Sequence, residues 1–216
     1  MNMLLLDVDG VIIRDKLLLE HVKYNAVQYV RTKLPDAKDP ARVNQLLYKR
    51  YGHTARGLHN AFGVDTKDFN TFVYDESLLT HLGHVLMSDE FKSDAEIIRE
   101  MSHKWDTRLF SNAPLEWTLP IASMLGVSVS HDHLFVKPDP RVYSKFPRDV
   151  KKYYVDDSIN NLWTAGYMYN WIPIHFDERA NKGPGFDPQF PTVSSVWELG
   201  LFMNSCDVSD KPTSDA

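Results

Sequence analysis

The chain has 216 residues, of which 43% are hydrophobic and 25% charged, and its formal net charge is −5. This composition is that of a globular protein, and it argues against nucleic acid polymers and anionic membranes as partners. No apolar run is long enough to span a membrane, strand-like sequence begins at Met3, and the single Cys206 excludes an intrachain disulfide, so we expect a cytoplasmic protein.

The first predicted element is a strand from Met3 to Leu6, because this run is apolar and unbroken, as in a strand buried on both faces of a parallel sheet. Asp7, Asp9 and Gly10 follow it directly. Strand side chains alternate, so the two carboxylates would point the same way, and ligands bind at the carboxyl ends of such strands. Two neighbouring carboxylates repel, and a divalent cation is the expected partner. We therefore predict a phosphoryl-transfer site here.

The next part of the sequence has helical patterns and no convincing strand. We predict one helix from Leu17 to about Lys33, ended by Pro35, and a second that begins at Pro40 and stops at Gly52. Two shorter helices are predicted over 54–62 and 66–74. Residues 16–87 are therefore interpreted as a helical insert of about four elements.

From about residue 88 strands and helices alternate, which is typical of a parallel sheet with helices on both faces. The predicted helices cover residues 94–103, 115–125 and 159–165, with a last helix capped by Ser194. The predicted strands cover residues 107–110, 134–136, 152–155 and 171–175. We predict an α/β core formed by residues 1–15 and 88–204, and we expect residues 205–216 to be a disordered tail.

Polar side chains that suit a phosphate follow four of the predicted strands. They are Asp7 with Asp9, Ser111, Lys137 from an adjoining loop, and Asp156 with Asp157. Because neighbouring parallel strands end at the same edge of a sheet, we expect these groups to meet. Hard oxygen ligands beside a phosphate favour Mg²⁺ as the cofactor.

These segments resemble the four motifs of the haloacid dehalogenase superfamily, specifically its aspartate-based phosphatases. They read Asp7-Val8-Asp9-Gly10-Val11, Ser111-Asn112, Lys137-Pro138-Asp139-Pro140 and Tyr154-Val155-Asp156-Asp157-Ser158. The resemblance implies a Rossmann-like parallel-sheet core, and the helical insert matches the position of the family's small helical cap. Inside the insert, residues 51–58 are similar to a segment of pyrimidine 5′-nucleotidase-like members.

The resemblance also implies the roles of the acidic residues. Asp7 would be the nucleophile that forms an aspartyl-phosphate, and Asp9 the general acid and then the general base. Dehalogenases of the superfamily lack the second aspartate, so Asp9 argues against dehalogenation. Asp7, the main-chain carbonyl of Asp9, and Asp157 would bind Mg²⁺. Asp156 would lie farther from the ion or pair with Lys137.

The remaining predicted site residues would contact the phosphate or the leaving group. Lys137 would neutralise phosphoryl oxygens, and Gly10 would allow a tight turn beside them. Ser111 and the amides of Asn112 and Ala113 would donate to the phosphate. In the insert, His53, Thr54 and Arg56 lie at a helix start and could meet the leaving group, although a solvated helix end fits their pattern equally well.

The resulting hypothesis is a Mg²⁺-dependent phosphomonoesterase acting on a small phosphorylated metabolite, with a nucleoside monophosphate slightly favoured. Two alternatives stay open. One is a phosphomutase similar to β-phosphoglucomutase, which would share the core residues. The other is a catalytically weak member of the superfamily that serves as a binding or regulatory module.

Overall fold

The computed structural model describes residues 1–130, 135–180 and 189–209. The strands of this part form one parallel six-stranded sheet in the order β3-β2-β1-β4-β5-β6, so the fold is α/β, as predicted. The strands are β1 (Met3–Leu6), β2 (Asp106–Leu109), β3 (Ser128–Val129), β4 (Lys152–Asp156), β5 (Ile172–Phe176) and β6 (Thr192–Val193). Within the described ranges, no helix has the length and apolar character needed to cross a membrane.

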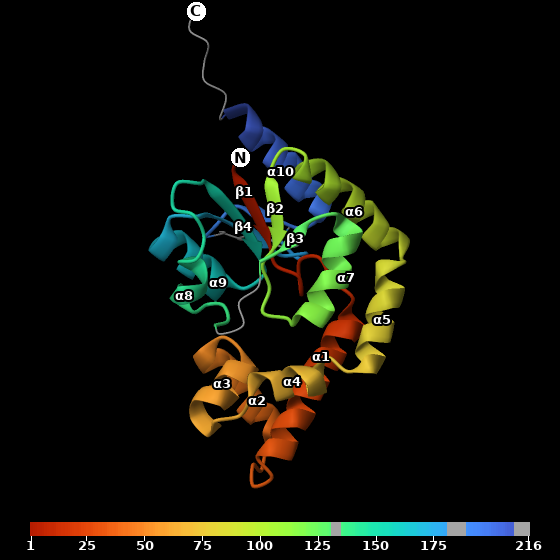
Figure 1. Cartoon of the computed structure of the whole chain (residues 1–216), viewed down its shortest axis with the longest axis vertical. Coiled ribbons are helices and arrows are strands. Elements are labelled where there is room, and N and C mark those ends of the chain that lie inside the picture. The colour runs from red at the N-terminus through yellow and green to blue at the C-terminus, as the bar shows by residue number, and fades with distance from the viewer. Residues whose placement is uncertain (131–134, 181–188, 210–216) are drawn as a thin grey trace, which may run out of the picture.

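Strand β1 lies in the middle of the sheet, between β2 and β4, and every residue in it is buried. Its side chains alternate between two cores: Leu4 and Leu6 pack into one, Met3 and Leu5 into the other. The first core also holds α6 (Asp89–Ser102), α7 (Leu115–Leu125) and α10 (Val196–Ser209). The second holds α8 (Pro140–Tyr143) and α9 (Ile159–Trp163), which continues as a π-helical turn over Thr164–Met168. Helices therefore cover both faces of the sheet (Figure 1).

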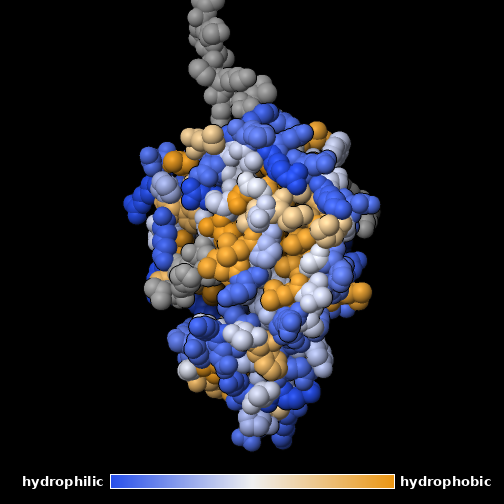
Figure 2. Space-filling model, turned by 45° about the vertical axis from the view of Figure 1, so that its right-hand side comes forward, coloured by the Kyte–Doolittle hydropathy of each residue, from blue (hydrophilic) through white to orange (hydrophobic). Residues whose placement is uncertain are grey.

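Four helices form a separate lobe below the sheet in the view of Figure 1. They are α1 (Lys16–Lys33), α2 (Pro40–Tyr51), α3 (Thr54–Phe62) and α4 (Thr66–Val73), close to the predicted ranges. This helical lobe has its own apolar core, which includes Tyr29, Leu47, Leu58 and Phe69. Its outer surface is mainly hydrophilic, whereas apolar residues gather on the sheet part of the same face (Figure 2).

Helix α5 (Glu76–Leu86) is not among the predicted elements. Asp75 caps it, and its buried residues Leu78, Leu82 and Leu86 belong to the same core as Leu4 of the sheet. The helix therefore packs with the sheet although it precedes residue 87. The boundary between the helical insert and the α/β core at residue 87 stays a prediction.

Several predicted elements differ from the structure. Residues 135 and 136 are not in a strand, and residues 131–134 lie outside the described part; the strand that follows α7 is β3. Strands β3 and β6 have two residues each, too short for a period of two to be recognised. Helix α6 begins at Asp89, earlier than predicted, because the Ser88 side chain accepts a hydrogen bond from the amide of Phe91.

Two predictions for the last helix also differ from the structure. The cap of α10 is Ser195, whose hydroxyl accepts from the amide of Glu198, while Ser194 donates to the Glu198 carboxylate. Helix α10 extends to Ser209, so the prediction of a disordered tail is wrong for 205–209. Residues 210–216 lie outside the described part.

Candidate active site

The loop after β1 places two acids at the carboxyl end of the central strand. The amide of Asp7 still donates to the Val155 carbonyl at 2.9 Å, which fixes its position beside β4. Asp9 accepts a hydrogen bond from the indole Nε1 of Trp117 at 2.9 Å. Gly10 adopts a φ of +90°, and a Cβ there would lie 2.5 Å from Asp157 Oδ2. Glycine therefore permits both the turn and the close approach of Asp157.

The predicted acids of β1 and β4 come together around Lys137. One carboxylate oxygen each of Asp7, Asp156 and Asp157 lies within 4.8 Å of the others. The Nζ atom of Lys137 is 2.9 Å from Asp7 Oδ1 and 2.8 Å from Asp156 Oδ2. Lys137 is only 1% exposed, so one buried ammonium serves at least two buried carboxylates.

The pKa values of this cluster follow from burial and crowding. Burial and the charge of Asp156 raise the pKa of Asp7 well above its ordinary value, against the opposing effect of Lys137. Asp157 is the most exposed of the three acids, but desolvation in the cleft and the charge of Asp156 still raise its pKa to about 7. Burial alone would lower the pKa of Lys137, but Asp156 and Asp7 raise it, so the lysine is positively charged. When all three carboxylates are ionised, they carry more negative charge than Lys137 can neutralise, and their oxygen atoms fit a hard cation such as Mg²⁺.

Asp156 accepts hydrogen bonds from several neighbours in addition to Lys137. Its oxygens accept from the hydroxyl of Tyr154, from the amide of Ser158 at 2.7 Å, and from Asn161 Nδ2 at 3.1 and 3.2 Å. A carboxylate so fully engaged has little capacity left for an ion. The geometry thus favours the second of the two roles predicted for Asp156, a partner for Lys137.

Ser111 and Asn112 follow β2 at the same edge of the sheet. The Ser111 hydroxyl accepts from the Ala113 amide at 3.1 Å and lines the same cleft as Asp7. The side chain of Asn112 clamps the backbone of Lys137: its Oδ1 accepts from the Lys137 amide at 2.7 Å and its Nδ2 donates to the Lys137 carbonyl at 3.0 Å. This clamp could not be predicted from the sequence, because it joins positions that are 25 residues apart in the chain.

A cleft of about 980 Å³ separates the strand ends from the helical lobe. On the sheet side it is lined by Asp7, Asp9, Gly10, Ser111, Asn112, Lys137 and Asp157. On the lobe side it is lined by residues that include Lys23, Arg42, Asn44, Tyr48, His53 and Thr54. The predicted residues His53 and Thr54 therefore do reach the cleft. Burial and Lys137 lower the pKa of His53 to about 4, so its ring is neutral at pH 7.

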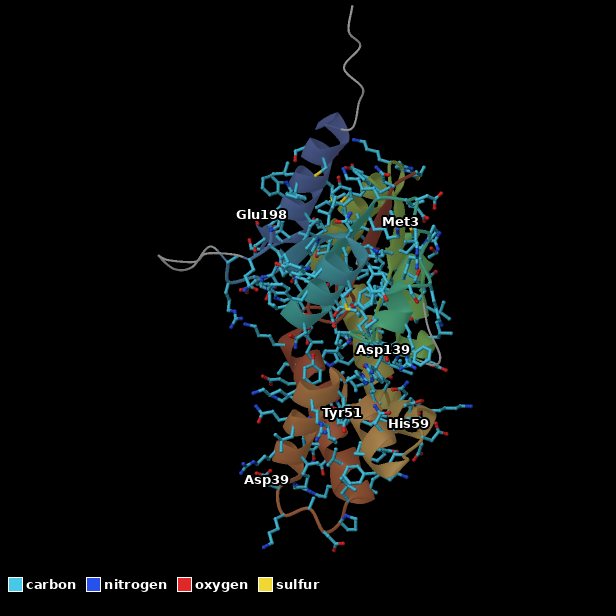
Figure 3. The ribbon with its side chains drawn as sticks, turned by 90° about the vertical axis from the view of Figure 1, so that its left-hand side faces the viewer. Met3, Asp39, Tyr51, His59, Asp139 and Glu198 are labelled. Carbon is cyan, nitrogen blue, oxygen red and sulfur yellow. The ribbon has the colours of Figure 1, made fainter. Side chains whose placement is uncertain are left out.

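Arg56, the third predicted residue of the lobe, does not line this cleft. It lines a second cavity of about 1030 Å³, and its guanidinium lies 2.7 Å from the carboxylate of Asp139, which is 3% exposed. Two positions along a helix correspond to about 200°, so Arg56 and Thr54 point in nearly opposite directions. Figure 3 shows Asp139 at the boundary between the sheet and the helices of the lobe.

A second contact joins the lobe to the same segment. Gly52, at the end of α2, packs so closely on Pro138 that a Cβ would lie 2.1 Å from its Cδ. Pro138 and Asp139 directly follow Lys137 in the chain. The lobe therefore contacts the loop that carries the buried lysine at two points, through Gly52 and through Arg56.

Gly10→Ala tests the close approach of Asp157. We expect a loss of activity of at least about 100-fold, because the added Cβ displaces a carboxylate of the cluster and φ is unfavourable for alanine. Steady-state kinetics and thermal unfolding measure the effect. Gly83→Ala, in α5 with no neighbour within 4 Å, is the matched control and should keep full activity. Equal activity of the two variants would contradict the packing described above.

No protein-family model matches the sequence, and no curated protein matches it. Solved structures do match, across nearly the whole chain. A HAD phosphatase from Thermococcus onnurineus superposes with a TM-score of 0.58 at 16% identity, over 94% of this chain and 98% of that one. CbbY from Rhodobacter sphaeroides, in complex with xylulose-(1,5)-bisphosphate, gives 0.59 at 15% identity over 93% and 96%.

A third match is a putative HAD-hydrolase, YfnB from Bacillus subtilis, bound to magnesium, with a TM-score of 0.50 at 15% identity over 94% and 98% of the two chains. Two structures of a dehalogenase and one of L-2-haloacid dehalogenase from Xanthobacter autotrophicus are also among the similar structures. At these identities the likeness establishes the fold, which agrees with the one that the four sequence motifs imply.

Proposed function

We propose that this chain, which has the fold of the haloacid dehalogenase superfamily, is a hydrolase that removes the phosphoryl group from a small phosphate monoester. The observation that carries the proposal is the buried Lys137 between Asp7 and Asp156, at the floor of a cleft that Asp9 also lines. A nucleophile, a proton donor and a fixed positive charge are the groups that this reaction needs.

The reaction has two halves. In the first, a carboxylate oxygen of Asp7 forms a bond to phosphorus, the bond to the leaving oxygen breaks, and Asp9 gives that oxygen a proton. In the second, a water oxygen forms a bond to the phosphorus of the aspartyl-phosphate and gives a proton back to Asp9. The bond between phosphorus and the Asp7 oxygen breaks, which releases inorganic phosphate and restores the Asp7 carboxylate. Burial raises the pKa of Asp9 to about 6, against the effects of Trp117 and Lys137, so an appreciable fraction is protonated near neutral pH.

Asp7, Asp157 and the main-chain carbonyl of Asp9 would hold a Mg²⁺ ion, with Asp156 keeping Lys137 in place. The ion would supply positive charge against the phosphoryl oxygens. The excess of buried carboxylate over ammonium supports this assignment. Lys137 would contribute a fixed positive charge beside the phosphoryl group. The Ser111 hydroxyl, which accepts from the Ala113 amide, would donate its own proton to a phosphoryl oxygen, and the amide of Asn112 would be a second donor.

Within the class of phosphate monoesters, a nucleoside monophosphate stays the favoured substrate. On the lobe side the cleft offers Tyr48, which is 54% exposed, and the exposed amide side chain of Gln45. An accessible aromatic ring and an accessible amide are suited to contact a planar base. Tyr48→Ala should then reduce kcat/KM for nucleoside monophosphates more than for phenyl phosphate.

The metal requirement is the first test. Purified protein with Mg²⁺ should release inorganic phosphate from at least one member of a panel of nucleoside monophosphates, sugar phosphates and phenyl phosphate. EDTA should abolish the release, Mg²⁺ should restore it, and Ca²⁺ should inhibit because its coordination is looser and larger.

Three other results would contradict the proposal, and each would point to a different function. Chloride release from 2-haloacids without phosphate release would mean a dehalogenase. Return of labelled phosphate to an isomeric sugar in a single turnover would mean a phosphomutase. No turnover of the whole panel would favour a binding or regulatory module.

A further inference from the structure

The indole of Trp117 lies against one oxygen of Asp9. Trp117 is fully buried on α7, and its Nε1 donates to Asp9 Oδ1 at 2.9 Å. The ring also packs edge-on against Tyr74, with the centroids 5.2 Å apart. Tyr74 and Asp9 both line the cleft. Burial, the contact with Tyr74 and the hydrogen bond to Asp9 together hold the indole in place.

The chemistry of the indole decides how this carboxyl is protonated. An indole N–H is a donor only, so the oxygen facing it must accept in both protonation states of Asp9. The proton of a neutral Asp9 therefore belongs on Oδ2. Within the described residues, Oδ2 has no hydrogen-bond partner.

We propose that Trp117 is the positioning residue of the proton donor: its indole N–H fixes Oδ1 of Asp9 and leaves Oδ2 as the one oxygen that passes a proton to the leaving group. This inference rests on the proposed phosphatase activity and adds the residue that orients its acid. Without the indole, the carboxyl can rotate, and its proton is no longer confined to the oxygen that faces the substrate.

The test compares leaving groups in the variant Trp117→Phe, which keeps a buried aromatic ring and removes the N–H. The ratio kcat/KM reports only the half-reaction that expels the leaving group, so it isolates the proton-donating role of Asp9. An alkyl phosphate needs that proton, whereas 2,4-dinitrophenyl phosphate has a leaving group that departs as an anion. We expect kcat/KM to fall about 10- to 100-fold for the alkyl ester and less than about threefold for the dinitrophenyl ester.

Trp105→Phe is the matched control. Trp105 is 4% exposed and lies in the same apolar core, packed on Tyr153 rather than on an acid of the site. The substitution Trp105→Phe should change kcat/KM for the two esters by the same factor. If kcat/KM in Trp117→Phe also fell by the same factor for both esters, Trp117 would not position the proton donor and would only pack in the core. This result differs from failure of the proposed function, in which the wild-type protein would hydrolyse neither ester.

A second measurement covers the case that Trp117→Phe does not fold. The chain has 5 tryptophans and therefore five indole N–H resonances. In Asp9→Ala, one of these resonances should move much more than the others, because its hydrogen-bond acceptor is gone. If none moves, the contact between Trp117 and Asp9 does not exist in solution and the inference is wrong.

Discussion

Replacing Asp7 with asparagine is expected to lower kcat by about 10⁴-fold or more, because an amide oxygen is too poor a nucleophile to form a covalent phosphoryl intermediate. The fold should be unchanged. Asparagine is nearly isosteric, the bond from the amide of residue 7 to the Val155 carbonyl is kept, and an amide oxygen can still accept from Lys137. The variant also removes one of the crowded carboxylates of the cluster.

Kinetics on the best substrate and thermal unfolding measure these two expectations separately. Asp65→Asn is a matched control: Asp65 caps α4 in the helical lobe, and asparagine caps a helix as well as aspartate does. Its activity should equal that of the wild type. If Asp7→Asn retained activity within tenfold of the wild type, the nucleophile would be another group.

Replacing Lys137 with methionine is the second large effect. We expect kcat/KM to fall about 10³-fold, because the fixed positive charge beside the phosphoryl group is lost. We also expect the free energy of unfolding to fall by about 3–5 kcal/mol, because Asp7 and Asp156 keep their burial and lose their partner. The substitution retains the apolar length of the side chain, which packs near Phe110 and Tyr154.

The stability loss of Lys137→Met should depend on pH. Loss of the ammonium raises the pKa of Asp7 further, because Lys137 is the group that lowers it, so the folded variant holds a proton that the unfolded chain releases. The stability of the variant is therefore greatest at low pH and falls as the pH rises through the folded-state pKa of Asp7. Chemical denaturation at about pH 5 and about pH 8 should give the larger difference from wild type at the higher pH. A difference that is the same at both values would mean that the two acids do not depend on Lys137.

The parts of the fold that could be predicted from sequence have strong local signals. Pro40 and Gly52 mark the two ends of α2, and the apolar run at Met3 marks the central strand. The gathering of Asp7 and Asp157 follows from the rule that parallel strands end at one edge. These signals need no knowledge of distant residues.

The parts that could not be predicted depend on side-chain contacts between distant segments. The Asn112 clamp on Lys137 and the hydrogen bond from Trp117 to Asp9 join positions that are far apart in the chain, so no local pattern predicts them. The direction of the Arg56 side chain could not be predicted for the same reason. It depends on the ion pair with Asp139, which lies far from Arg56 in the chain. A local sequence pattern can indicate that a residue belongs to the site, but only the tertiary structure shows which residue it contacts.

The contacts of Gly52 with Pro138 and of Arg56 with Asp139 also constrain how the helical lobe can move away from the sheet. Any rotation of the α1–α4 lobe that admits a ligand must either break this attachment or use it as the pivot. A pivot there keeps the segment next to Lys137 stationary while the rest of the lobe moves away from the strand ends. A ligand could then enter and leave while the ammonium of Lys137 stays in place between Asp7 and Asp156.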